Sequence, residues 1–350
     1  MLIDTSVHPI LADQELFPLI GKPWSDGRLP DPMGLRHVPP DPGVIIDPGL
    51  TADPAEFARV LFGERGVDVA VISPLTRGLE PNPQVAAAVA RATNTWVADR
   101  WLSQIQYGGR FAGSIRLPVT NVAASLAEIR TWADDPRFVQ VAVPMRTFVP
   151  YGDDTYLPIW EVVADLGLPV AIYDDYATGV AHPESPVGAV RYFAEKFAAT
   201  PFSDIVHMAT LITCGIFDRV PGLKVIFGDA SVDLGRVMLW RLEKDWRSGR
   251  VEIPWVERIP SQYAQPHLRF VSHPEDGVAD GATVSPDLLG ISDAEHLVLF
   301  GSHFPYWDAM DAKTVYDQWP GPIQDRVLSG NALEAMPRLA SFLKSQTNPQ

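Results

Sequence analysis

Eight short apolar runs, separated by longer segments, recur along this 350-residue chain and restrict the folds open to it. Several runs are almost continuous in Val, Ile, Leu, Ala and Phe, which is typical of strands buried on both faces of a parallel sheet. The runs occupy residues 2–8, 67–73, 111–117, 138–144, 169–175, 224–230, 268–273 and 296–302. Helical patterns lie between many of them, at residues 84–105, 121–133, 157–166, 187–198, 203–218 and 234–247. This alternation predicts an α/β fold, the (β/α)8 TIM barrel.

A doubly wound open sheet is the alternative fold for the same alternation. Its dinucleotide-binding form carries G-x-G-x-x-G directly after the first strand. No such motif follows residues 2–8, so the barrel is favoured.

The segment 9–66 differs from the rest because it is rich in Pro, Gly and Asp, as in PPDPG at 39–43. We interpret it as a long insertion after the first strand that serves as a lid or a subunit interface, with surface padding as the alternative. No internal repeat or linker is visible. Residues 1–350 are therefore expected to form a single domain, and 344–350 a frayed tail.

The composition narrows the partners and the compartment. The net charge of −15, from 28 basic and 43 acidic side chains, argues against nucleic acid or an anionic membrane as a partner. A small anionic substrate remains compatible, because one local arginine can bind it. A single cysteine, Cys214, precludes an intrachain disulfide and fits a reducing compartment. With no signal-peptide pattern at the start and no apolar run near the ~20 residues of a membrane span, a cytoplasmic protein is expected.

Polar residues at the predicted strand ends are the candidate site. In a (β/α)8 barrel the active site lies at the carboxyl ends of the strands, so these side chains should converge. They are Asp4, Ser6, His8, Arg116, Arg146, Tyr173, Asp174, Asp175, Asp229, Ser231, Ser272, His273, Ser302, His303 and Tyr306.

Five motifs in order resemble the amidohydrolase-related family, which includes aminocarboxymuconate semialdehyde decarboxylase and the hydroxybenzoate decarboxylases. They cover almost the whole chain: IDTSVHP, YLPIWEVVADLGLPVAIY, LITCGIFDRVPGLKVIFGDAS with LWRLEKDWR, HLVLFGSHFPYWD and LSGNAL. The resemblance implies an amidohydrolase-like barrel, a small carboxylate as substrate and a homodimer.

The same resemblance identifies where the chain departs from its family. The family holds a divalent metal with two strand-1 histidines, a strand-5 histidine and a strand-8 aspartate. Those positions here are Ser6, His8, Tyr173 and His303, and Tyr306 stands in place of a further family histidine. Asp229 replaces the catalytic histidine of the decarboxylases. A catalytic zinc needs about three nitrogen, sulfur or carboxylate ligands, so the inherited site is broken and no cofactor is expected.

Two histidines are the expected proton-transfer groups. Imidazole titrates near ~6.5, whereas an aspartate like the family residue at position 303 titrates near ~3.9. His8 and His303 are therefore predicted to act as acid and base; the alternatives are a structural His8 and a His303 that fills the volume of the lost metal. Asp229 would orient an imidazole. Tyr173 would either fill space or donate to an oxyanion.

The other candidates are assigned to substrate binding. Arginine can bind a carboxylate in a bidentate manner, with a salt bridge to a neighbouring acid as the alternative. The substrate-binding set is Ser6, Asp174, Arg116, Arg146, Ser302 and Tyr306. His207 is interpreted as a packing residue and Cys214 as a core residue.

The predicted function is a metal-independent acid–base enzyme that acts on a small carboxylate, aromatic or polyketide-like substrate. The reaction would be decarboxylation, a lyase or cyclisation step, or hydrolysis of an ester or lactone, although hydrolysis loses the metal-activated hydroxide. Two alternatives stay open. One is a catalytically inactive protein that binds a ligand or partners a homologue; the other is a zinc enzyme that uses His8, Asp229 and His303.

Overall fold

The computed structural model describes residues 1–25, 53–174, 191–192, 195, 198–272, 294–306, 309–316 and 319–347. Two of the candidate site residues, Asp175 and His273, lie outside this range. The same is true of 26–52 in the expected insertion and of most of the expected helix at 187–198.

Eight parallel strands form one sheet in the order β1 to β8. They are β1 (Ile3–Val7), β2 (Val69–Ile72), β3 (Phe111–Arg116), β4 (Phe138–Pro144), β5 (Val170–Tyr173), β6 (Val225–Phe227), β7 (Leu268–Val271) and β8 (Val298–Leu299). The segment after β8 returns to β1, where the amide of Thr5 donates to the Phe300 carbonyl (2.9 Å) and the amide of His8 to the Phe304 carbonyl (2.8 Å). These bonds close the ring, and the prediction of a (β/α)8 barrel is confirmed.

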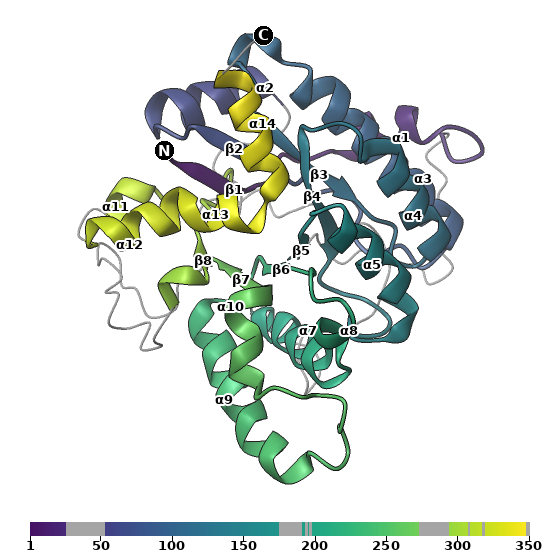
Figure 1. Cartoon of the computed structure of the whole chain (residues 1–350). Coiled ribbons are helices and arrows are strands. Elements are labelled where there is room, and N and C mark those ends of the chain that lie inside the picture. Colours follow the sequence, from purple (N-terminus) through teal and green to yellow (C-terminus); the bar gives the residue numbers. More distant parts are fainter. Residues whose placement is uncertain are drawn as a thin grey trace.

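Helices surround the strands on the outside (Figure 1). The described α-helices are α1 (Asp13–Ile20), α2 (Pro54–Phe57), α3 (Pro83–Trp96), α4 (Val122–Trp132), α5 (Leu157–Asp165), α7 (Pro201–Thr213), α8 (Ile216–Arg219), α9 (Val232–Gly249), α10 (Ala264–His267), α11 (Ala312–Tyr316), α12 (Gly321–Asp325), α13 (Asn331–Ala335) and α14 (Pro337–Thr347). Shorter π-helical turns occupy Ala58–Glu64, Val97–Leu102 and Arg326–Gly330. Turns of 3-10 helix occupy Ile105–Tyr107, Asp154–Tyr156, Pro260–Tyr263 and Ala294–His296. None of the described helices is both long and apolar enough to cross a bilayer.

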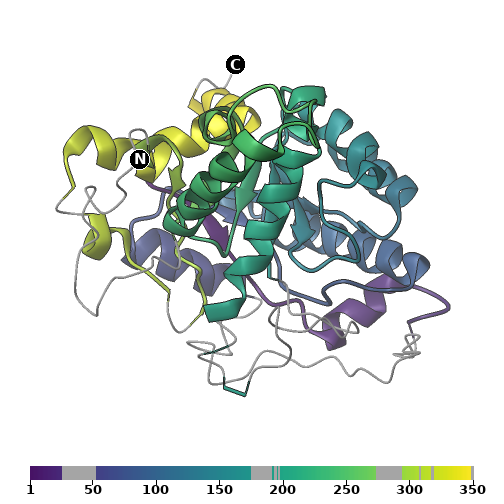
Figure 2. The same ribbon diagram turned by 90° about the horizontal axis from the view of Figure 1, so that it is seen from below.

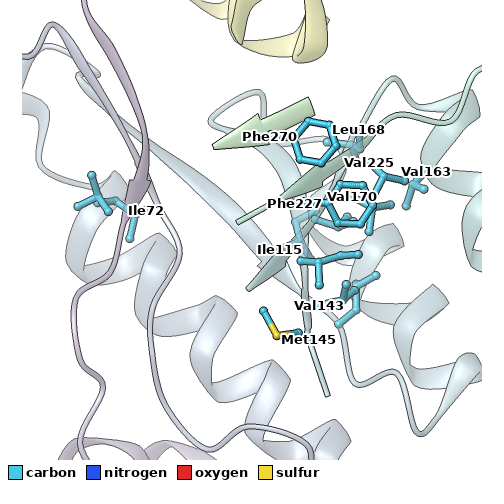
Figure 3. Close-up of a cluster of buried hydrophobic side chains, with 14 of the residues drawn as sticks. Ile72, Ile115, Val143, Met145, Val163, Leu168, Val170, Val225, Phe227 and Phe270 are labelled. Atoms are coloured by element: carbon cyan, nitrogen blue, oxygen red, sulfur yellow. The ribbon is translucent and has the colours of Figure 1, made fainter. Parts of the chain in front are cut away.

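Side chains that point outward from the strands pack against these helices and form the larger core. Figure 3 shows Ile115, Val143, Val170, Phe227 and Phe270 in this layer. The helices start where the sequence supplies caps. The Asn82 side chain accepts hydrogen bonds from the first amides of α3, and the Ser231 side chain accepts the amide of Leu234 in the first turn of α9.

Side chains that point inward fill the barrel and form a second core cluster. Small and branched residues dominate it, and α13 and α14 contribute to it from one end. The guanidinium of Arg338 on α14 donates to the carbonyls of Ala133 and Asp135, which precede β4, so these helices cover the amino ends of the strands. Helix α1 lies at the opposite end, where the carboxyl ends of the strands open (Figure 2).

The structure differs from three of the sequence expectations. The helix expected at 203–218 breaks at Gly215, whose φ of 68° is left-handed and whose missing Cβ would lie 2.7 Å from the Trp255 ring. Cys214 lies at this break and is exposed, so its assignment to the core was wrong. Helix α14 extends to Thr347 into the expected tail.

Candidate active site

The strand ends bring most of the predicted site residues together. Ser6 lies in β1 and His8 directly after it; Tyr173 ends β5; and Ser302 and His303 follow β8. Asp4 joins the first and last of these elements, because its Oδ1 accepts the amide of Ser302 at 2.9 Å and that of Ser6 at 3.2 Å.

His8 is held by hydrogen bonds at both ring nitrogens. Its Nδ1 lies 2.9 Å from the carbonyl oxygen of Ser73, after β2, and its Nε2 lies 2.7 Å from the Ser6 hydroxyl. A carbonyl oxygen only accepts, so Nδ1 carries a hydrogen. In the neutral ring Nε2 then accepts the hydroxyl proton of Ser6. His8 and Ser6 are 2% and 1% exposed.

His303 lies beside His8 on a turn with unusual backbone geometry. Its φ is 61°, a left-handed value that is uncommon for a residue with a side chain. The amide of Tyr306 donates to the His303 carbonyl (3.0 Å), and the two rings stack at 4.1 Å. The His303 ring centroid is 5.5 Å from that of His8, edge to face. The turn therefore presents a partly exposed imidazole next to a buried one.

Tyr173 occupies the centre of the site as a neutral hydrogen-bond donor. Its hydroxyl donates to the Thr5 carbonyl (2.9 Å), and its ring lies edge to face with His8 at 4.9 Å. Burial raises the pKa of this phenol above its ordinary value, and the charges of Asp229 and Asp4 raise it further. The ring also belongs to the inner core cluster, which supports the space-filling interpretation of Tyr173.

The ring of Tyr173 packs against Gly228, where no larger residue fits without a clash. A Cβ at position 228 would lie 2.2 Å from Tyr173 Cδ1 and 2.7 Å from the Ile172 carbonyl oxygen. We expect Gly228→Ala to lower the free energy of unfolding by about 1–3 kcal/mol, as overpacking does. Urea unfolding measures it. Gly222→Ala is the matched control, because the nearest atom to its added Cβ is at an ordinary 3.6 Å; equal stabilities of the two variants would contradict the prediction.

A carboxylate cluster lies next to Tyr173 at the ends of β4, β5 and β6. Asp229 Oδ2 accepts the amide of Asp174 (2.8 Å), and the guanidinium of Arg146 lies 3.8 Å from the Asp174 carboxylate. Asp229 therefore holds the main chain after β5, and its expected orientation of an imidazole stays a prediction. Arg146 makes the ion pair that was the alternative to substrate binding, at a distance longer than a direct hydrogen bond.

Asp204 on α7 is part of this cluster and was missed by the sequence reasoning. Its Oδ2 accepts the amides of Asp229 (3.2 Å) and Ala230 (3.1 Å). Burial raises the pKa of Asp204 well above its ordinary value, and the charge of Asp229 raises it further. An acid within the apolar pattern 201–213 was the available signal.

Arg116 and Ser302, two further residues of the predicted substrate-binding set, make hydrogen bonds to the main chain. Arg116 donates from its guanidinium to the carbonyls of Arg77 and Gly78, which braces the loop after β2. The Ser302 hydroxyl accepts the amide of Phe304 at 3.1 Å. Substrate binding by Arg116, Ser302 and Tyr306 stays a prediction.

His207 has the packing role that its helical position predicted. The amide of Tyr151 donates to its Nδ1 (3.2 Å), so its Nε2 donates to the Met145 carbonyl (2.6 Å). Burial lowers the pKa of His207 to about 4. The ring is therefore neutral at pH 7 and ties α7 to the segment after β4.

The donor set does not fit the metal of the family. The Nε2 of His8 lies within hydrogen-bond distance of Ser6, and Tyr173 is a neutral phenol bonded to a main-chain carbonyl. A serine hydroxyl and a neutral phenol are poor ligands for zinc, so of the four family positions only His8 and His303 carry a good donor atom. The alternative zinc set of His8, Asp229 and His303 stays a prediction; within the described part of the chain, no group of three or more His, Cys, Asp or Glu is placed to hold an ion.

An eight-stranded parallel barrel with titratable side chains at the carboxyl ends of its strands defines the class of TIM-barrel proteins with a site at the barrel mouth. The family model described as "Amidohydrolase" matches residues 6–337. The chain belongs to the amidohydrolase family, and the resemblance seen in its motifs is confirmed.

Curated relatives and solved structures agree with this placement. Gamma-resorcylate decarboxylases of Rhodococcus jostii and Polaromonas sp. are 25% and 26% identical over 55% and 59% of this chain. The chain spans only 60% and 62% of their lengths. The structure of 5-carboxyvanillate decarboxylase from Sphingomonas paucimobilis matches with a TM-score of 0.70 and 19% identity, over 96% of this chain and 98% of that one. A Polaromonas dihydroxybenzoic acid decarboxylase with bound manganese and 2-nitroresorcinol matches with a TM-score of 0.68 and 18% identity, over 95% and 96%. At such identities the structures show the shared fold alone.

Proposed function

We propose that this protein is a metal-independent acid–base enzyme that decarboxylates a small hydroxyl-substituted aromatic acid. The observation that carries the proposal is the pair of imidazoles, His8 and His303, 5.5 Å apart at the junction of the first and last strand ends. The names of the two curated relatives, both gamma-resorcylate decarboxylases, support the substrate class.

The reaction needs an acid and a base, and the two histidines differ in the way the roles require. The base takes the phenolic proton of the substrate, which raises the electron density of the ring. The acid adds a proton to the ring carbon that bears the carboxylate; the bond to the carboxylate then breaks, its electron pair returns to the ring and CO2 leaves. His303 is partly exposed and can recover its proton from solvent, so we assign it as the acid. His8 is buried and fixed by Ser73, so we assign it as the base.

Arg146, which lies beside the carboxylate cluster, is the group that we assign to bind the substrate carboxylate. Arg146 is 12% exposed and its guanidinium is held near the mouth by Asp174 at 3.8 Å. A substrate carboxylate can take a bidentate contact with this planar fork. Tyr173 and Asp229 assist: Tyr173 forms an aromatic wall beside His8, and Asp229 fixes the loop that carries Asp174.

We expect turnover without a bound metal. The protein, dialysed against a chelator, is assayed for CO2 release from a series of mono- and dihydroxybenzoates, and its zinc, manganese and iron are measured by elemental analysis. Activity should be unchanged after the chelator, and each metal should be far below one ion per chain, because the residues that the structure describes include no three-ligand set. Stoichiometric metal whose removal stops turnover, and whose return restores it, would contradict the proposal.

One observation favours a non-catalytic alternative. The hydroxyl of Ser6, both nitrogens of His8 and the hydroxyl of Tyr173 all have hydrogen-bond partners within the protein. A site whose polar groups already have hydrogen-bond partners within the protein could bind an aromatic acid without reacting with it. Saturable binding of a hydroxybenzoate by calorimetry, together with no CO2 release over many hours, would favour this alternative.

A further inference from the structure

The hydroxyl of Ser6 and the imidazole of His8 form a buried hydrogen-bonded pair, and this pair has a chemistry of its own. A nucleophilic serine can be identified in a structure because a base lies within hydrogen-bond reach of its hydroxyl and a third group orients that base. Ser6 Oγ lies 2.7 Å from His8 Nε2, and His8 Nδ1 lies 2.9 Å from the Ser73 carbonyl oxygen. We infer that Ser6 and His8 form a nucleophile–base pair that accepts the acyl group of an ester or lactone of a small acid.

The tautomer required for this chemistry is imposed by the fold. The Ser73 carbonyl accepts only, so the hydrogen of the neutral ring resides on Nδ1 and the lone pair of Nε2 faces the serine hydroxyl. The main chain of Ser6 is fixed as well, since its amide donates to Asp4 Oδ1 at 3.2 Å. Both reacting side chains are thus held in position by buried groups.

The acyl transfer is balanced within the site and needs only water as co-reactant. Ser6 Oγ forms a bond to the acyl carbon while its proton moves to His8 Nε2. The carbon–oxygen bond to the alcohol or phenol breaks, and the leaving oxygen takes the proton from Nε2. Water then attacks the Ser6 ester by the same route and releases the acid.

The groups around Ser6 and His8 limit both the rate of acyl transfer and the size of the acyl group that can react. The orienting group is a neutral carbonyl rather than the carboxylate of a triad, so the imidazolium is stabilised less and turnover should be slow. Slow deacylation favours accumulation of the acyl-enzyme. With Ser6 only 1% exposed, small acyl groups should react best.

The test uses the full chain and p-nitrophenyl acetate as the probe. Cys214 is exposed and would itself react, so all variants carry Cys214→Ser. We expect a burst of about one equivalent of p-nitrophenolate and, after a rapid quench, an acetyl group on the peptide that contains Ser6, found by mass spectrometry. Ser6→Ala should lose this acetyl group. His8→Gln should slow the burst by about 10²-fold or more.

Ser114→Ala is the matched control, because Ser114 is a buried barrel serine bonded to Ser73 Oγ and Gln140. It should keep the burst. Thermal unfolding checks each variant, and His8→Asn replaces His8→Gln if the latter does not fold. Absence of acetyl on Ser6, or acetylation at an unchanged rate without His8, would overturn the inference.

The inference goes beyond the proposed decarboxylation and is separable from it. CO2 release from the hydroxybenzoate series is measured on the same preparations. CO2 release with Ser6 unlabelled contradicts the nucleophile–base pair alone. Labelled Ser6 without CO2 release contradicts the decarboxylase proposal alone.

Discussion

His303→Asn is expected to reduce CO2 release by about 10²–10⁴-fold, the usual contribution of a positioned acid or base. Asparagine keeps a hydrogen-bonding side chain of similar size but cannot exchange a proton near neutral pH. His303 lies 5.5 Å from the ring of His8 and is partly exposed, so its replacement removes the group assigned to protonate the substrate. His8→Asn should give a loss of the same order, since it removes the base.

The comparison is made on kcat/KM over a range of pH. Each single variant should lose one limb of the wild-type pH profile, and the double variant should be little worse than the poorer single variant, because the two residues serve one reaction. His296→Asn is the control, since His296 lies on the 3-10 turn before β8 and is 3.7 Å from Glu295. Undiminished turnover in both site variants would exclude the assignment.

Asp4→Asn is expected to stabilise the protein at pH 7 by up to about 3 kcal/mol. Burial raises the pKa of Asp4 from 3.8 to about 6, against the lowering effect of hydrogen bonds from Ser302 and Ser6. Between these two pH values the folded protein keeps a proton that the unfolded chain has released. Stability from this group therefore falls as pH rises through the window and is level above it. The rise in the pKa of Asp4 to about 6 corresponds to about 3 kcal/mol.

Urea unfolding at pH 4 and pH 7 measures the effect. The wild type should lose stability from Asp4 between the two pH values, whereas Asp4→Asn should not, so the variant gains only at the higher pH. An amide oxygen can still accept the two amides that Asp4 Oδ1 accepts. A variant that is equally destabilised at both pH values would show that the charge of Asp4 is not the source of the penalty.

The barrel was predictable because its physical signal is repeated. A strand buried on both faces has to be apolar throughout, and eight such runs leave little choice of architecture. Local breaks were less predictable, because they depend on distant partners. The helix at 203–218 ends early at Gly215, where Trp255 occupies the space of the missing side chain.

The site was predictable as a set of positions but not as a set of contacts. Strand-end logic placed Ser6, His8, Tyr173 and His303 together, and the structure brings them together. It could not show that Ser6 bonds to His8, because strand alternation fixes faces and not rotamers. Asp204 was missed because it reaches the strand ends from a helix, a contact that depends on tertiary packing.

The seam that closes the ring has a consequence for redesign of this protein. Strand β8 is only two residues long, and the amides of Thr5 and His8 are paired instead by Phe300 and Phe304 in the segment that carries His303. A graft that replaces this segment to install new chemistry would also remove the hydrogen-bond partner of β1 on the edge that β2 does not cover. The exposed strand edge could then pair with another chain, so such grafts should be screened for aggregation before they are screened for activity.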